Sequence, residues 1–194
     1  MSVVRIIIWP NAILDKSCSL VGEVNENIRA IVTDLVDTCD RVQGFGLAAP
    51  QIGHSLQICV LNMNLLTGGE QSGYKVMINP TIVECTGSRM IDEGCLSIPG
   101  VMGRVTRAVK VAVEFLNLDG NVERFEAENT LAQAVEHEID HLAGKVMTKR
   151  MPRFRMSKIR LQMERLKKKL RQRGFVYPHD LPDAGDVSYA DAVD

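Results

Sequence analysis

The chain has 194 residues, of which 45% are hydrophobic, and it carries a formal net charge of −1. These values fit one globular domain with a sizeable core and room for an appendage. No apolar run approaches the roughly 20 residues that a membrane-spanning helix needs, so we expect no membrane span.

Residues 6–8 are the first apolar run, and they predict a strand or an extended arm because the run is too short for a signal peptide. Residues 25–43 predict a helix, since apolar residues recur there at helical spacing and Gly44 and Gly46 follow. Residues 58–62 and 75–79 predict two strands, joined by a hairpin-like loop over residues 66–73.

A second strand pair is predicted over residues 109–118 and 122–127, with a turn at Asp119 and Gly120. Asn129 or Thr130 can cap the next helix, which should run to about residue 146. Strands in the middle of the chain and helices towards its two ends indicate an α+β fold with mostly antiparallel pairing.

Charge divides the chain into three blocks. Residues 1–144 hold 10 basic and 18 acidic side chains, residues 145–173 hold 13 basic and one acidic, and residues 174–194 hold five Asp and no Lys or Arg. We therefore expect a main domain over residues 1–147, a basic C-terminal helix over 148–174, and an acidic, disordered tail over 175–194.

The basic block also predicts a helix from residue 157 to residue 173. Its narrow apolar stripe comprises Ile159, Met163, Leu166 and Leu170. Two roles are open for this helix. It can pack on the domain with its Lys and Arg outward, or it can dock on a phosphate-rich partner such as RNA.

Five cysteines are present, an odd number without framework spacing. They indicate reduced thiols and a cytoplasmic location. Four are expected to be small buried hydrophobes, and Cys95 is the exception.

The most informative motif is His137-Glu138-Ile139-Asp140-His141. Two histidines four apart on a helix lie on the same face and can bind one metal ion. The glutamate beside the first histidine points about 100° around the helix, so it faces a water at the ion better than the ion itself. The motif predicts a hydrolytic metal centre.

Two histidines leave a tetrahedral ion one protein ligand short if one position is kept for water. A third histidine of the metzincin kind fails, because Met147 stands at that position. Glu164 would serve as in thermolysin-like proteases, but it lies in the basic block. Cys95 is the remaining choice, in a segment that Gly94 and Pro99 predict to be an exposed turn.

Three segments together resemble the signatures of the peptide deformylase family. They are Gly44-Phe45-Gly46-Leu47-Ala48-Ala49-Pro50-Gln51-Ile52-Gly53, Glu93-Gly94-Cys95-Leu96-Ser97 and His137 to Gly144. The resemblance covers roughly residues 5–147. It implies antiparallel sheets around a central helix that carries His-Glu-x-x-His. It also implies hydrolysis of the N-formyl group from the initiator methionine of nascent polypeptides, with release of formate.

By this resemblance Cys95, His137 and His141 hold one divalent metal ion. Ferrous iron is favoured by the family, and the same donors suit zinc, nickel or cobalt. Glu138 is then the acid–base group. The side chain of Gln51 and the backbone N–H of Leu96 are expected to donate hydrogen bonds to the oxyanion.

The substrate is expected to bind along the first glycine-rich segment. Gly44, Phe45 and Gly46 should hold the peptide backbone as an added strand. Phe45, Ile98 and Ala134 match lining positions of the methionine pocket. The family also uses its C-terminal helix for ribosome docking, which makes ribosomal RNA an expected partner. Glu93 and Arg107 resemble a buried pair that steadies the cysteine loop, and Asp140 should orient a histidine or a neighbouring loop, unless it is solvent-exposed.

The chain departs from the usual family pattern at Glu136, Gln133, Met102 and Lys149. None of these is an expected ligand, base or oxyanion donor, so the departures bear on rate and preference. Two alternatives remain at this point: a deformylase-like module that binds ribosomal RNA without hydrolysis, and a zinc endopeptidase that uses Glu164. His54 and His179 lack partner spacing and are interpreted as non-ligands.

Overall fold

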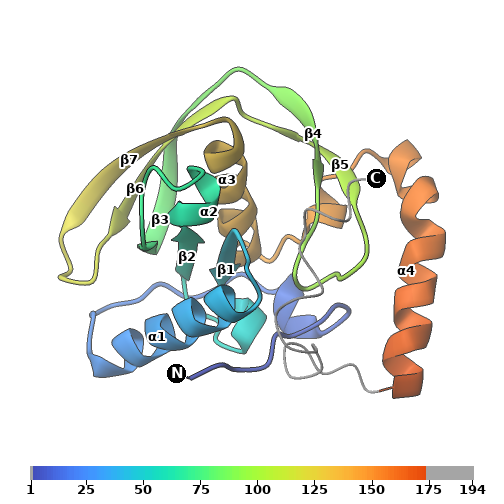
Figure 1. Ribbon diagram of the computed structural model, residues 1–194, viewed down its shortest axis with the longest axis horizontal. Coiled ribbons are helices and arrows are strands. Elements are labelled where there is room, and N and C mark those ends of the chain that lie inside the picture. Colours follow the sequence, from blue (N-terminus) through green and yellow to red (C-terminus); the bar gives the residue numbers. More distant parts are fainter. Residues whose placement is uncertain (1, 174–194) are drawn as a thin grey trace.

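A five-stranded antiparallel sheet organises the computed structural model, which describes residues 2–173 (Figure 1). Its strand order is β1-β2-β3-β6-β7. The strands are β1 (Gly46–Ala48), β2 (Ile58–Asn62), β3 (Tyr74–Thr86), β6 (Lys110–Leu116) and β7 (Val122–Glu128). All four pairings are antiparallel, which confirms the predicted pairs 58–62 with 75–79 and 109–118 with 122–127.

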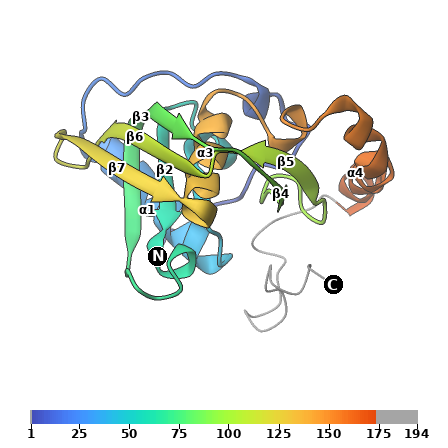
Figure 2. The ribbon, with the colours of Figure 1, turned by 90° about the horizontal axis from the view of Figure 1, so that it is seen from above.

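A separate two-stranded sheet joins β4 (Arg89–Glu93) to β5 (Gly103–Arg107). The sequence did not predict this hairpin. Alternate residues of β5 are buried, but the buried ones are a glycine, a valine and an arginine. The sequence therefore lacks the alternation of apolar and polar residues that indicates a strand. Both strands lie between the larger sheet and the last helix (Figures 1 and 2).

The helices are α1 (Glu26–Arg41), α2 (Met63–Leu66), α3 (Asn129–Leu142) and α4 (Arg153–Arg173). Short 3-10 turns are η1 (Ala12–Asp15), η2 (Ala49–Ile52) and η3 (Met147–Lys149). None of the described helices has the combination of length and apolar composition that crossing a bilayer requires. The predicted disorder of residues 175–194 lies outside the described residues.

The ends of α3 correct two predictions. The N-cap is Glu128, without a side-chain cap, and Asn129 has a positive φ of 55°. The helix ends at Leu142 because Gly144 takes the left-handed conformation, with φ of 66°. A methyl group at Gly144 would lie 2.7 Å from the carbonyl carbon of Lys16, so close approach of the N-terminal chain also requires glycine there.

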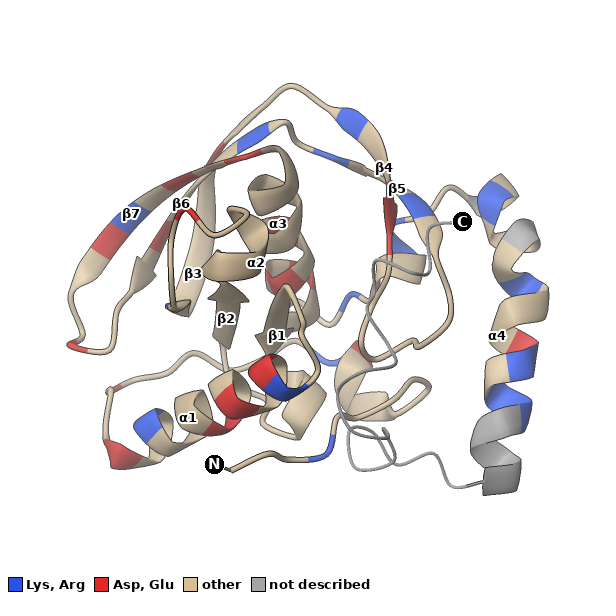
Figure 3. Ribbon diagram, in the orientation of Figure 1, with Lys and Arg blue, Asp and Glu red and all other residues tan. Residues whose placement is uncertain are grey.

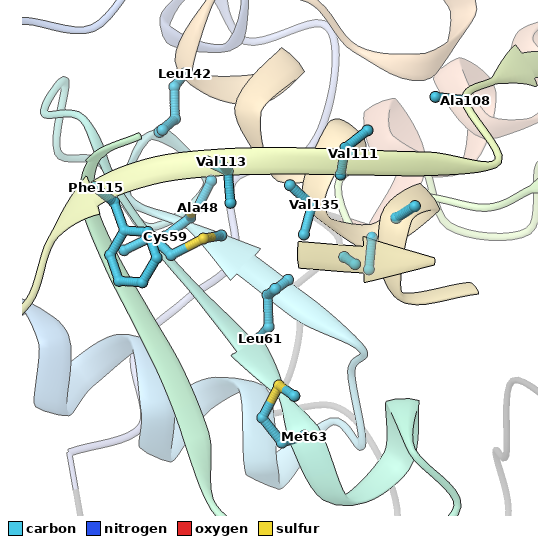
Figure 4. Close-up of a cluster of buried hydrophobic side chains, with 14 of the residues drawn as sticks. Ala48, Cys59, Leu61, Met63, Ala108, Val111, Val113, Phe115, Val135 and Leu142 are labelled. Atoms are coloured by element: carbon cyan, nitrogen blue, oxygen red, sulfur yellow. The ribbon is translucent and has the colours of Figure 1, made fainter. Parts of the chain in front are cut away.

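Two hydrophobic clusters cover the two faces of the larger sheet. Alternate residues of β2 divide between them: Cys59 and Leu61 face α3, whereas Ile58 and Val60 face α1. Figure 4 shows the cluster between the strands and α3, with Val135 of the helix among the strand side chains. Burial on both faces explains why β2 is apolar throughout.

A third cluster joins α4 to the rest of the molecule. Ile159, Met163 and Leu166 are buried there, together with Cys95 and Ile98. This confirms three members of the apolar stripe, while the side chain of Leu170 lies outside the description. The helix starts at Arg153, four residues before the predicted start. Its described portion therefore packs on the domain.

The N-terminal arm forms no strand within the larger sheet. It runs extended across two loops, where Ile7 N donates to Gln51 O at 2.7 Å and Trp9 N donates to Ser97 O at 2.9 Å. The arm thus joins the first two motif segments, which are far apart in the sequence.

Candidate metal centre

Helix α3 places His137 and His141 one turn apart, with ring centroids 4.9 Å from each other. Their burial follows from the position of α3 against the larger sheet, which it contacts along β1, β2 and β7. The predicted pair of histidines on one helix face is present in the structure.

Cys95 joins the two histidines from the loop that follows β4. Cys95 and the three residues after it are buried, so the expectation of an exposed turn is wrong. Its Sγ lies 3.2 Å from His141 Nε2, and the ligand atoms of Cys95, His137 and His141 all lie within 4.8 Å of one another. One thiol and two imidazoles at this separation match the donor set of a first-row divalent ion. The three residues therefore fit a metal ion.

Glu164 is not part of this cluster. It lies on α4 with its side chain 60% exposed, and it pairs with Lys167 at 3.3 Å. Among the described residues, the group that could hold a metal is Cys95, His137 and His141. The alternative of an endopeptidase that uses Glu164 therefore has no support from this arrangement. His54 is exposed and outside the group, and His179 lies beyond the part of the chain that the structure describes.

Glu93 fixes the orientation of His137. The Nδ1–H of His137 donates to Glu93 Oε1 at 2.7 Å, because an ionised carboxylate can only accept. This bond leaves Nε2 of the same ring free to bind an ion. Arg107 in turn holds Glu93 through two hydrogen bonds, of 2.8 and 2.9 Å. The expected buried pair is present, with both side chains almost fully enclosed.

Protonation of the two histidines differs. Burial lowers the pKa of His141 well below its usual value, with His137 as a further cause, so this ring is neutral and can act as a ligand. Burial also acts to lower the pKa of His137, but hydrogen bonds to Cys95 and Glu93 outweigh it and raise the value well above normal. The carboxylate of Glu93 and the thiol of Cys95 therefore distinguish the surroundings of His137 from those of His141.

Glu138 is buried beside this cluster, and its Oε2 has no hydrogen-bond partner within the described residues. Burial raises the pKa of its carboxyl to about 7. A methyl group placed on Gly46 of β1 would lie only 2.7 Å from Glu138 Oε1. The glycine of the first motif and the glutamate of the third therefore meet directly.

Gln51 is held in one orientation by its neighbours. Its Oε1 accepts from Ala48 N at 2.8 Å, and its Nε2 donates to Ser97 Oγ at 3.2 Å. A carboxamide nitrogen carries two protons, so Gln51 keeps one for another acceptor. Ser97 was not predicted as the partner of Gln51, although Ser97 closes the second motif.

The backbone N–H of Leu96 makes no hydrogen bond to any described residue. Leu96 follows the predicted ligand Cys95, and its side chain lies 3.0 Å from the position that a methyl group on Gly44 would take. The first and second motifs are therefore in contact as well. Leu96 retains a free donor on the loop that carries the cysteine.

The expected methionine pocket is less sharply defined. Ile98 is fully buried in the third cluster, Ala134 is buried in the cluster between α3 and the sheet, and Phe45 is 52% exposed. A shared pocket for these residues stays a prediction. A cavity of about 390 Å³ is lined instead by residues of other segments, which include Asp40, Gln43, Asn62 and Tyr74.

Asp140 is buried, which excludes the expectation of solvent exposure. Its carboxylate accepts from Arg107 and Arg150 and from no histidine among the described residues. The sequence analysis missed Arg150, because nothing in its local pattern distinguishes it from the other basic residues of its block.

Comparison with known proteins agrees with the three motifs. A family model described as polypeptide deformylase matches residues 3–157. The chain is 36% identical over 169 residues to a peptide deformylase of Buchnera aphidicola, covering 87% of this chain and 95% of the relative. It is 39% identical over 154 residues to peptide deformylase 1 of Bacillus anthracis, covering 79% and 96%.

Solved structures give the same result. A peptide deformylase of Ehrlichia chaffeensis in complex with actinonin matches with a TM-score of 0.80 and 36% identity, covering 88% of this chain and 99% of that one. A peptide deformylase of Legionella pneumophila matches with a TM-score of 0.79 and 32% identity, covering 88% and 98%. The antiparallel α+β architecture is thus common to this chain and these structures.

Proposed function

The chain belongs to the polypeptide deformylase family, and from that premise we propose how its own residues carry the reaction. The protein is a metallohydrolase that removes the N-formyl group from nascent polypeptides. Hydrolysis adds one water across the formyl C–N bond, so the products are formate and a free α-amine. This chemistry calls for a proton acceptor, donors for an oxyanion, and a means to polarise the carbonyl.

Cys95, His137 and His141 are the proposed metal ligands. The observation that carries this proposal is the convergence of their donor atoms within 4.8 Å, next to a buried carboxylate. A divalent ion held there would supply the Lewis acidity that polarises the formyl carbonyl and acidifies water. Ferrous iron is the proposed metal on the family resemblance, and the donor set also accepts zinc, nickel or cobalt.

Glu138 is the proposed acid–base group. Its partnerless oxygen and its pKa of about 7 suit a carboxylate that accepts a proton from water and later delivers it to the leaving nitrogen. Gly46 keeps the backbone of β1 close to this carboxylate. Substrate held along β1 would therefore lie beside the group that moves the proton.

Gln51 and Leu96 are the proposed oxyanion donors. The Gln51 amide is oriented in advance by Ala48 and Ser97, so its remaining N–H needs no reorganisation when negative charge develops. The Leu96 N–H is a second such donor on the cysteine loop.

The peptide is proposed to bind along β1. This strand lies at the edge of the larger sheet and pairs only with β2 within the described fold, so its other side can accept a further strand. Gly44, Phe45 and Gly46 would hold the peptide backbone there, and Phe45, Ile98 and Ala134 would contact the methionine side chain.

A cobalt-substituted protein tests the metal centre. We expect one cobalt per chain and a sulfur-to-metal charge-transfer band in the near ultraviolet. Cys95→Ser should abolish that band and weaken metal retention, because a hydroxyl replaces a soft thiolate. Cys85→Ser is the matched control, since Cys85 lies outside all three motifs and is exposed, contrary to the expectation of a buried thiol. Persistence of the band in Cys95→Ser would assign the sulfur to another residue.

A second proposal concerns α4 and the ribosome. The described side chains of Arg160, Arg165 and Lys168 are exposed, while Ile159, Met163 and Leu166 hold the helix on the domain. Figure 3 shows basic residues along α4, whereas acidic residues lie on α1 and on β6 and β7 of the larger sheet. We propose that this basic surface docks on ribosomal RNA, which would place the enzyme where nascent chains emerge.

A further inference from the structure

Arg150 lies between η3 and α4, outside the three motifs, yet it binds a residue of the metal helix. Its Nε donates to Asp140 Oδ2 at 2.8 Å, and a second guanidinium nitrogen donates to Asp140 Oδ1. Asp140 stands directly before His141 on α3. A two-point bond between a planar guanidinium and a carboxylate fixes direction as well as distance.

Further hydrogen bonds connect Asp140 to His137, which is a proposed metal ligand. Arg107 Nη1 donates to Asp140 Oδ2 at 2.6 Å, and the same guanidinium holds Glu93 through its other two bonds. Glu93 in turn accepts from His137 Nδ1 at 2.7 Å. Four successive charge-assisted bonds therefore lead from the start of the C-terminal segment to the ring of His137.

The charges of the buried groups explain why Arg150 is needed at the outer end of this series of bonds. Glu93 and Asp140 are two buried carboxylates, and Arg107 is the buried cation between them. Without Arg150, the guanidinium of Arg107 would have to pair with both carboxylates. The side chain of Asp140, which is only 4% exposed, would then have too few hydrogen-bond donors. Arg107 would then be drawn towards Asp140, which would loosen its hold on Glu93.

From this geometry we propose that Arg150 is a positioning residue of the metal centre, acting through Asp140, Arg107 and Glu93 on His137. The proposal rests on the metal ligands proposed above. It differs from them in predicting that a residue of the C-terminal segment controls how tightly the ion is held. Within the described residues, Arg150 has no hydrogen bond or ion pair with a ligand side chain. Outer residues of this kind change metal affinity or activity by about 10- to 100-fold.

Metal release from the intact cobalt-loaded chain tests the proposal, with a chelator in excess and the absorbance of the cobalt protein as readout. We expect Arg150→Ala to release cobalt about 10-fold faster than the unmodified chain. Arg150→Lys should fall between the two, because an ammonium restores the charge but not the two-point geometry. In steady-state assays kcat should fall while KM stays unchanged, since the side-chain hydrogen bonds of Arg150 within the described residues go to Asp140 and not to a residue proposed to hold the peptide.

Two control variants separate this role from general destabilisation. Arg104 makes the same two-point bond to Asp92 on the exposed side of β4 and β5, at 3.1 and 3.0 Å, without a link to the ligands. Lys149 precedes Arg150, and its ammonium pairs with Asp15 at 2.7 Å and donates to Gly144 O at 2.8 Å. Within the described residues it bonds neither Asp140 nor Arg107, so it stands outside the series that leads to His137. Arg104→Ala and Lys149→Ala should release cobalt at the unmodified rate.

The outcomes are distinct. Unmodified release from Arg150→Ala would overturn the proposal, and so would equally rapid release from Lys149→Ala. If Arg150→Ala does not fold, Arg150→Lys and Arg150→Gln are compared instead, and equal release from these two would also overturn it. An unmodified chain that binds no stoichiometric cobalt would contradict the proposed metal ligands, which is a different failure.

Discussion

At the scale of single residues, Glu138 and Glu136 are two carboxylates on the same helix with different surroundings. Glu136 Oε2 accepts from Ala108 N at 2.7 Å, which ties α3 to the turn after β5. Glu138 faces Gly46 and keeps one oxygen without a partner in the described structure. This contrast supports Glu138, and not its neighbour, as the group that moves protons.

Replacing Glu138 should therefore abolish most of the turnover without removing the metal. For Glu138→Ala we expect kcat to fall by at least about 10²-fold, the scale for a lost acid–base group. Metal content per chain should stay near one. Glu136→Gln is the matched change at the adjacent carboxylate, and it should cost much less. Near-normal turnover by Glu138→Ala would remove the basis for its role.

Gly46 offers a second residue-scale prediction. A methyl group there would meet Oε1, Cγ and Cδ of Glu138 at 2.7 to 3.0 Å, so the carboxylate must shift. We expect Gly46→Ala to lower kcat by about 10-fold or more, since misplacement of a reacting group by about 1 Å costs roughly 10²-fold. Gly22→Ala is the control, because a methyl group at Gly22 meets nothing within 4 Å. Equal rates for the two variants would contradict the contact.

At the scale of elements, periodic segments were predictable and the second sheet was not. α1 and the strand pairs β2–β3 and β6–β7 follow their apolar spacing closely. The hairpin of β4 and β5 was missed because its buried positions include Arg107, a charged residue that pairs with Glu93 of the same hairpin and with Asp140 of α3. Local pattern cannot reveal a partner that only the tertiary fold provides.

In the candidate site, too, some residues could be predicted from the sequence and others could not. The helical spacing of His137 and His141 and the turn residues around Cys95 were visible in the sequence, and the structure brings these three side chains together. Ser97 and Arg150 were not anticipated as partners of Gln51 and Asp140. Both are ordinary polar residues, whose importance depends on which buried group faces them.

Helix α4 gives a prediction about stability. Leu166 is buried in the third cluster with Cys95 and Ile98, whereas Leu161 on the same helix is 60% exposed. We expect Leu166→Ala to lower the free energy of unfolding by about 2 kcal/mol, the low end for a buried leucine because the helix is peripheral. Leu161→Ala should change it by less than about 0.5 kcal/mol. Urea unfolding of both variants measures the difference, and equal values would show that α4 does not pack as described.

Burial of α4 also bears on how its docking role can be tested. A deletion of the helix would remove Ile159, Met163 and Leu166 from the cluster that contains Cys95. Such a deletion changes the domain and the basic surface at once. Surface substitutions that keep the apolar side of α4 separate the two effects.

At the scale of the whole molecule, net charge near zero conceals a basic block beside an acidic body. Replacing Arg160, Arg165 and Lys168 with Gln should leave hydrolysis of a short formyl peptide unchanged. Ribosome co-sedimentation should weaken, and the slope of log affinity against log salt should fall by about 2 to 3. The matched control replaces Lys16, Arg41 and Lys75 with Gln. Equal co-sedimentation of both triple variants across the salt series would exclude docking through α4.

The central claim is that this metal centre hydrolyses an N-formyl group at the start of a peptide. The most direct measurement is formate and free amine released from formyl-Met-Ala-Ser by the iron-loaded protein under anaerobic conditions, beside unformylated Met-Ala-Ser. We expect one formate for each new amine and no cleavage of the unformylated peptide. Absence of formate, or cleavage of an internal peptide bond in either substrate, would contradict it.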